Sequence, residues 1–138
     1  MPDVRSPAAE VTGLMNTDPL SNGSDSLAFS VTREPGYAVL SVAGDVDAGT
    51  EQDFRDALTS VLTHGVLRIV VDLSRVDFMS SAGIGVVMGV RRVLSDAGGS
   101  VVLASPHGQV AQVLSMTGVA EVIPVTASLD DAVAALGS

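Results

Sequence analysis

Two adjacent serines followed by closely spaced glycines form the segment of this chain whose residue types are best suited to chemistry. The segment reads Asp72-Leu-Ser-Arg-Val-Asp-Phe-Met-Ser80-Ser81-Ala-Gly83-Ile-Gly85. The apolar run before Asp72 predicts a buried strand, and the serines fall where a helix is expected to begin. A serine at a helix N-terminus can cap free N–H groups, and the same groups can hold a phosphate. Three interpretations follow: a capping residue, a hydrolase nucleophile at a strand–turn–helix elbow, and a phosphorylation switch.

Three glycines, Gly83, Gly85 and Gly89, fall inside this predicted helix. A glycine inside a helix lowers its stability by about 1 kcal/mol relative to alanine. The chain uses alanine freely elsewhere, so the glycines indicate that something approaches the backbone closely here.

The rest of the chain argues against an enzyme. The hydrolase interpretation lacks a Gly-x-Ser-x-Gly frame, and neither His64 nor His107 is placed to serve it or to bind a metal. All seven basic residues are Arg, so the chain has no P-loop lysine, and it has no Cys to act as nucleophile or ligand. The spacing from Gly83 to Gly89 departs from the dinucleotide fingerprint by one residue. We expect no enzyme activity, no metal and no cofactor.

Length and charge narrow the class of partner. The chain has 138 residues, and 46% of them are hydrophobic, which fits one globular domain. Its net charge is −9. An acidic chain without a basic cluster repels phosphates, so we expect no nucleic-acid partner and no membrane partner. The longest apolar stretch, Ala82 to Val90, is about half of a bilayer span. The first residues do not resemble a signal peptide, and we expect a cytoplasmic protein.

Hydrophobic periodicity predicts a series of strands and helices after an N-terminal tail. Residues 1–26 contain scattered Pro, Gly, Ser and Asn without a period, which is typical of a flexible tail. Thr50 is the expected N-cap of the first helix, with Asp53 completing a variant capping box, and His64-Gly65 ends that helix. The expected elements are a hairpin over 27–43, a helix over 50–64, a strand over 66–72, a loop over 73–79, a helix over 80–97, a strand over 100–104, a helix from Pro106 to Gly118, an edge strand over 122–125, and a helix from Ser128 whose apolar stripe is Leu129, Val133 and Leu136.

The order β-β-α-β-α-β-α-β-α predicts an α/β fold. Strands that alternate with helices form a mostly parallel sheet, and the opening hairpin makes it a mixed β-sheet with helices packed on it.

Two motifs together resemble the STAS domain of anti-sigma factor antagonists. They are Gly44-Asp-Val-Asp47-Ala-Gly-Thr50 and the segment from Asp72 to Gly85. The stretch from Met116 to Ala132 is also similar to that family. The resemblance covers residues 27–136 in the right order, so we assign 27–138 to a STAS domain. It implies a four- or five-stranded mixed sheet covered by helices.

The resemblance also implies a partner-switching role in bacterial transcription and stress responses. In this family the unmodified antagonist binds an anti-sigma factor that is itself a serine kinase, and a sigma factor is released. The kinase then phosphorylates the antagonist, and a PP2C-type phosphatase reverses the modification. The resemblance places the phosphorylated serine at Ser81 and matches Asp47 to an acidic residue near it. The family often has Asp immediately before that serine, whereas this chain has Ser80, which is the alternative acceptor.

The expected partner-binding surface combines the start of the 81–97 helix with the 44–50 loop. Ile84 and Met88 could instead belong to the core, since a nearly all-apolar helix start is usually buried. The acidic residues around Glu51 form either a solvated helix face or a contact for an Arg-bearing partner. An alternative function is a STAS interaction module of a lipid-transport or stress-sensing complex that is not phosphorylated. The expected surface residues are Asp45, Asp47, Thr50, Ser80, Ser81, Gly83, Ile84, Gly85 and Met88.

Overall fold

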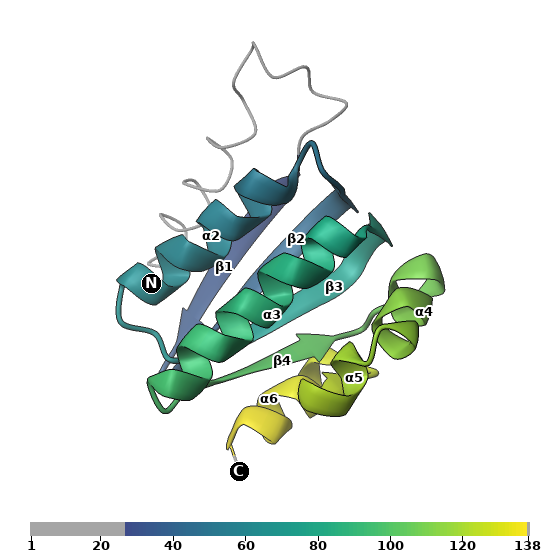
Figure 1. The fold of residues 1–138 in the computed structure, drawn as a ribbon. Helices are drawn as coiled ribbons and strands as arrows, with labels where there is room; N and C mark the ends of the chain where they lie inside the picture. The colour runs from purple at the N-terminus through teal and green to yellow at the C-terminus, as the bar shows by residue number, and fades with distance from the viewer. Residues whose placement is uncertain (1–26, 138) are drawn as a thin grey trace.

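Five strands form one mixed sheet in the spatial order β1-β2-β3-β4-β5 (Figure 1). The structure is a computed structural model that describes residues 27–137, and the predicted tail over 1–26 lies outside the described residues. β1 and β2 are antiparallel, and the other neighbouring strands are parallel. The strands are β1 (Ala28–Glu34), β2 (Tyr37–Val46), β3 (Arg68–Met79), β4 (Ser100–Ala104) and β5 (Val125–Thr126).

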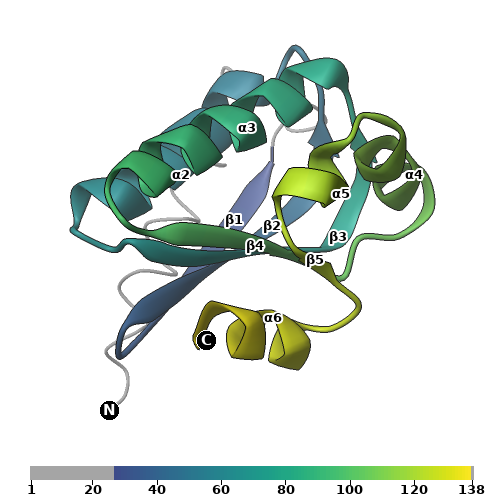
Figure 2. The ribbon, with the colours of Figure 1, turned by 60° about the horizontal axis from the view of Figure 1, so that its bottom comes forward.

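Helices cover the two faces of this sheet unequally, as Figure 2 shows. One long helix follows β2 and another follows β3, and these two lie side by side on one face, whereas the last helix covers the opposite face. The predicted α/β architecture with a mixed sheet is therefore confirmed. The helices are α2 (Glu51–Thr63), α3 (Ser81–Asp96), α4 (Gly108–Met116), α5 (Val119–Val122) and α6 (Leu129–Gly137).

The sheet separates a larger core from a smaller one. On the larger side Phe54 and Leu58 of α2 and Ile69 and Val71 of β3 belong to one cluster of buried side chains. Full burial of such a side chain contributes about 1.5–3 kcal/mol each, so this side dominates the stability of the fold. The smaller core lies between the sheet and α6 and consists of Val39, Val70, Val102, Ala104, Ala132 and Leu136.

The predicted loop over 73–79 is wrong, because β3 continues through it to Met79. The β2–β3 pairing shifts between Ser41 and Ala43 and again between Gly44 and Asp45. These irregularities let Leu73, Val76 and Met79, three residues apart, all reach the core. A spacing of three hides the strand from a search for alternating residues. β3 therefore leads without a break into the serine pair at the start of α3.

The predicted edge strand over 122–125 is mostly not a strand, because Val122 ends a short helix and only Val125 of this range belongs to β5. Gly118 has φ of +82° and ends α4 as predicted, but the chain then forms the short helix α5 up to Val122. Only Val125 and Thr126 pair with β4, at the edge of the sheet. Pro124 has no N–H to offer a strand ladder, although its carbonyl accepts a hydrogen bond from the Leu103 N–H.

Two further helix details differ from expectation. α4 begins at Gly108 rather than near Pro106. In α6, Leu136 is buried and Val133 packs against the smaller core, but Leu129 is exposed, and the buried position one turn before Leu136 belongs to Ala132. The small Ala132 side chain allows α6 to lie close to the sheet.

Candidate functional site

The serine pair forms the N-terminus of α3, and its two hydroxyl groups have different roles. The Ser80 N–H donates to the carbonyl of Val46 on β2 at 2.8 Å, which ties the end of β3 to its neighbour. Ser80 is the N-cap of α3, and its Oγ accepts from the Ala82 N–H at 3.2 Å. Ser81 is the first helical residue and is exposed. Its hydroxyl has no hydrogen-bond partner among residues 27–137, so it is accessible to another molecule.

The loop after β2 begins beside this serine pair, because Val46 pairs with Met79 in the sheet. Asp47 Oδ1 accepts from the Gly49 N–H at 2.9 Å and from the Thr50 N–H at 3.1 Å. The loop is therefore held by its own side chains, and the exposed Asp45 precedes it as the next-to-last residue of β2. Since β2 and β3 are parallel, α2 and α3 both begin at this end of the sheet (Figure 1).

Thr50 is the N-cap residue of α2, as predicted, but its side chain holds this loop instead of bonding to the first turn of the helix. Its side-chain hydroxyl donates to the Asp45 carbonyl at 2.7 Å and accepts from the Asp47 N–H at 3.0 Å. No side-chain cap bond forms at the start of α2, so the predicted capping box with Asp53 is wrong. Thr50 is only 2% exposed, which leaves it no direct contact with a partner. The Thr50 hydroxyl bonds to the Asp45 carbonyl instead of the first turn of α2, and it is the fold of the loop that brings this carbonyl within reach.

The glycines of α3 fall into two kinds. A Cβ atom on Gly83 would overlap Val46 and Met79, so the fold itself requires glycine there. At Gly85 and Gly89 an added Cβ would meet nothing within 4 Å. Both are exposed and follow Ser81 at intervals of four residues, so they lie on one solvent-facing stripe of the helix. Internal packing therefore explains Gly83 but leaves Gly85 and Gly89 unexplained.

The apolar residues of this helix are shared between the core and the surface. Ile84 and Met88 are partly buried and pack against the larger core, and part of each side chain remains exposed. Val93, further along α3, is 56% exposed. The surface beside Ser81 is thus a mixture of bare backbone and partly covered apolar side chains.

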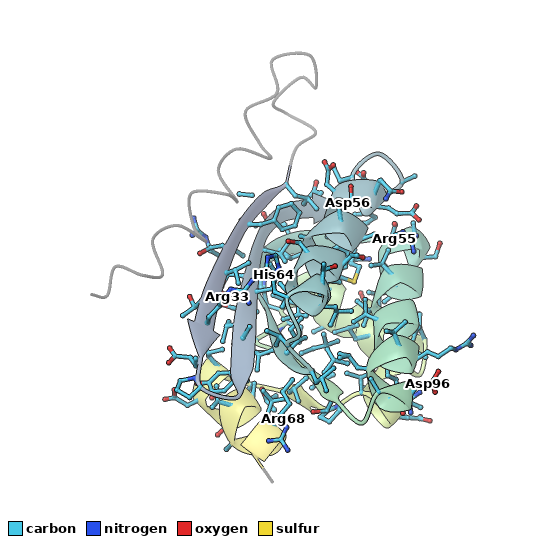
Figure 3. All side chains as sticks on the ribbon, turned by 90° about the vertical axis from the view of Figure 1, so that its left-hand side faces the viewer. Arg33, Arg55, Asp56, His64, Arg68 and Asp96 are labelled. Atoms are coloured by element: carbon cyan, nitrogen blue, oxygen red, sulfur yellow. The ribbon has the colours of Figure 1, made fainter. Side chains whose placement is uncertain are left out.

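The acidic side chains near the start of α2 form a mostly solvated face. Glu51 pairs with Arg55 at 2.7 Å, and Asp56 accepts from Gln52 at 2.8 Å, each one turn apart on the helix. Arg55 and Asp56 are labelled on α2 in Figure 3. Exposed pairs of this kind contribute well under about 1 kcal/mol. Because these pairs are weak and exposed, they leave the carboxylates of Glu51 and Asp56 accessible from solvent.

Gln109, on α4, is a residue of this site that the sequence pattern missed. Its Oε1 accepts from the Met79 N–H at 2.9 Å, and its Nε2 donates to the Met79 carbonyl at 3.0 Å. The two residues are 30 positions apart. No local pattern distinguishes Gln109 from the exposed Gln112 on the same helix, so no sequence signal could have found it.

Other parts of residues 27–137 offer little chemistry. They contain no group of three or more His, Asp or Glu side chains arranged to hold a metal ion. Among these residues, no helix is both long and apolar enough to cross a bilayer. His107 lies 4.0 Å from Asp77, and both are exposed. A cavity of about 260 Å³ near Arg33, Tyr37 and Val66 lies at the opposite end of β2 and β3 from the serines.

Similarity to known proteins covers most of the chain. The STAS domain family model matches residues 28–132. BtrV of Bordetella bronchiseptica, whose name describes it as a proposed anti-sigma factor antagonist, is 31% identical over 109 residues, or 79% of this chain and 94% of BtrV. The crystal structure of an anti-sigma factor antagonist from Mycobacterium paratuberculosis matches with a TM-score of 0.76 at 26% identity, over 83% of this chain and 97% of that one.

The fold is also that of SpoIIAA from Bacillus, an anti-sigma factor antagonist solved in unphosphorylated and phosphorylated forms. The unphosphorylated structure matches with a TM-score of 0.61 over 80% of this chain and 99% of SpoIIAA. The phosphorylated structure matches with a TM-score of 0.60 over 77% and 96%. Both are 23% identical to this chain, which is a likeness of fold. With the family match over residues 28–132 and the similarity to BtrV, this chain belongs to the STAS domain family, among the anti-sigma factor antagonists.

Proposed function

We propose that this antagonist binds an anti-sigma factor serine kinase while Ser81 is unmodified, and that phosphorylation of Ser81 ends the binding. The observation that carries the proposal is the contrast between the two serines. Ser81 is exposed with a free hydroxyl, whereas the Ser80 Oγ is engaged in capping α3. Binding of the anti-sigma factor frees a sigma factor, and a PP2C-type phosphatase restores the unmodified protein. We therefore propose that the protein acts in the cytoplasm, where sigma factors act on RNA polymerase.

The modification step needs little from this chain besides access. The Ser81 Oγ attacks the γ-phosphorus of ATP, the bond to the ADP oxygen breaks, and the hydroxyl proton passes to a base of the kinase. The N-terminus of α3 then faces the new phosphate with its positive end and its free N–H groups. The phosphorylated form is therefore stable without a change of fold.

The partner is proposed to dock along the exposed stripe of α3 and the neighbouring loop. Gly85 and Gly89 lie on that stripe with open space above them, which permits a partner backbone to approach closely. Asp45 and Asp47 flank the stripe at its start and favour a partner with cationic side chains. Ile84 and Met88 add partly exposed apolar area, and the flexible Met88 side chain can adapt to the partner.

Phosphate at Ser81 opposes this docking by charge and by desolvation. It adds a charge of about −1.5 to −2 close to two aspartates. A docked partner would have to remove water from that dianion, at a cost of about 2–5 kcal/mol in binding free energy. This corresponds to a loss of affinity of about 30-fold to several thousand-fold. Local repulsion is sufficient for the switch.

Mapping of phosphate on the protein isolated from the bacterium that encodes it tests this function. Tandem mass spectrometry that resolves the two serines is expected to find phosphate on Ser81 and an unmodified Ser80. Pull-down of the anti-sigma factor is expected to succeed without ATP and to fail after incubation with ATP. Protein without phosphate on either serine in growing and stressed cells would contradict the switch. That result would favour the STAS module of a lipid-transport or stress-sensing complex.

A further inference from the structure

The last residues of β3 lack a strand partner on one side. β4 pairs with β3 only as far as Asp72 opposite Ala104, yet β3 continues to Met79. On the other side β2 accompanies it to the end, where Val46 pairs with Met79. The backbone of Met79 therefore needs an acceptor and a donor from outside the sheet.

The side chain of Gln109 supplies both groups. An amide side chain carries one acceptor oxygen and a donor nitrogen, which is the pattern of a peptide unit in a neighbouring strand. Its bonds to the Met79 N–H and carbonyl are 2.9 Å and 3.0 Å long and partly buried. Gln109 thus replaces the missing strand partner at the last residue before the serine pair.

The connection from β4 to α4 uses uncommon backbone conformations to bring Gln109 there. Ser105 has φ of +59°, a left-handed conformation that side chains disfavour, and Gly108 has φ of +55°. Ser105 is held by bonds from its N–H to the Thr126 carbonyl at 2.8 Å and from its Oγ to the Ala127 carbonyl at 3.3 Å. The position of Gln109 is therefore built into the fold by contacts away from Gln109 itself.

Met79, held by Gln109, in turn packs against the first turn of α3. Its side chain is fully buried and lies against Gly83 in the first turn of the helix, where an added Cβ would be 2.8 Å from Met79 Cγ. The next residue, Ser80, is held on the opposite side by its bond to Val46. The end of β3 is thus fixed from both sides, by α4 and by β2, immediately before Ser81.

We infer that Gln109 is a positioning residue that keeps Ser80 in the helix cap and presents Ser81 alone to the modifying kinase. Adjacent serines make such a constraint necessary, because a helix that began one residue later would use Ser81 as its cap and release the Ser80 hydroxyl. The inference rests on the proposed function for the identity of the modification. The anchoring of the junction itself is independent of that function.

Amide hydrogen exchange of the full chain, measured residue by residue by NMR, tests the anchoring. In Gln109→Leu we expect protection of the Met79, Ser80 and Ala82 amides to fall by about tenfold or more. Amides of Val70 and Val71 in the middle of β3 should keep their protection. The matched control is Gln112→Leu, since Gln112 is exposed on the same helix. Unchanged protection at Ala82, or an equal loss at every amide, would overturn the inference.

A second variant, Gln109→Glu, separates hydrogen bonding from packing. A protonated carboxyl group has an acceptor oxygen and an O–H donor, so it can make both bonds to Met79, whereas the carboxylate has no donor. We expect Ala82 protection factors near those of the parent at a pH below the carboxyl pKa, and low values at pH 8. His107 and Asp77 are the ionisable side chains at the same α4–β3 contact, 4.0 Å apart. The parent and Gln109→Leu are therefore measured at both pH values, and equal behaviour of Gln109→Glu at the two would overturn the role of the bonds.

Phosphate mapping connects the anchoring with the choice of serine. In the bacterium that encodes the protein, we expect the ratio of Ser81 to Ser80 phosphate to fall at least about fivefold in Gln109→Leu and to stay at the parental value in Gln112→Leu. A parental ratio in Gln109→Leu would overturn the positioning role. If the parent carries no phosphate, the proposed function fails, and the exchange pattern alone decides whether Gln109 holds the junction.

Discussion

Gly83 on α3 and Val46 on β2 approach so closely that no side chain fits between them. A Cβ atom on Gly83 would lie 2.6 Å from Val46 Cγ1 and 2.8 Å from Met79 Cγ. Val46 and Met79 are both 0% exposed, so neither can move aside into solvent. This contact fixes the first turn of α3 against the ends of β2 and β3, and with it the position of Ser81.

Gly83→Ala is expected to destabilise the protein although alanine is the better helix former. The added methyl group overlaps two buried side chains, and such overpacking costs about 1–3 kcal/mol. Urea denaturation monitored by circular dichroism measures the effect. Gly89→Ala is the matched control, because its Cβ meets open space and alanine should stabilise the helix by about 0.5–1 kcal/mol. Equal stabilisation by both changes would contradict the close contact.

Gly85→Ala is expected to stabilise the protein and to weaken its binding to the anti-sigma factor. The change should raise the free energy of unfolding by about 0.5–1 kcal/mol, since the position is helical and open. The same methyl group would hold a partner backbone away from the helix and lower affinity for the anti-sigma factor by about tenfold, or about 1.4 kcal/mol. Titration calorimetry measures the affinity, with Ser95→Ala near the end of α3 as the control. Unchanged affinity would exclude close approach at Gly85.

The two serines should differ in their effect on stability. Ser80→Ala removes the side-chain acceptor of the Ala82 N–H and should cost about 1 kcal/mol. Ser81→Ala removes an exposed hydroxyl and should change stability by less than about 0.5 kcal/mol. Thermal unfolding of the two variants side by side measures the difference. A larger loss for Ser81→Ala would mean that Ser81 supplies the cap.

Ser81 variants should lock the proposed switch in its two states. Ser81→Ala keeps the neutral surface and should bind the anti-sigma factor equally with and without ATP. Ser81→Glu places a permanent negative charge at the same point and should weaken binding by about tenfold or more. Pull-down and titration with the purified anti-sigma factor measure both. Phosphorylation of Ser81→Ala at the parental rate would move the modified residue to Ser80.

Much of the fold is determined by local sequence patterns. Phe54, Leu58 and Val61 recur at helical spacing, which is enough to place α2 on the core. The apolar run before Asp72 and the serines that follow it likewise predict the first part of β3, up to Asp72, and the beginning of α3. These elements depend on neighbours along the chain, so the sequence alone predicts them correctly.

Contacts between distant segments decided the rest. The irregular β2–β3 pairing turns residues 73–79 into strand. The bond from Gln109 to Met79 joins positions 30 apart in the chain. The sequence determined that a serine pair would begin a helix after a buried strand. Only the tertiary structure decided that the helix begins after Ser80 and leaves the Ser81 hydroxyl free, because Val46 and Gln109, distant in the chain, hold the backbone of Ser80 and Met79.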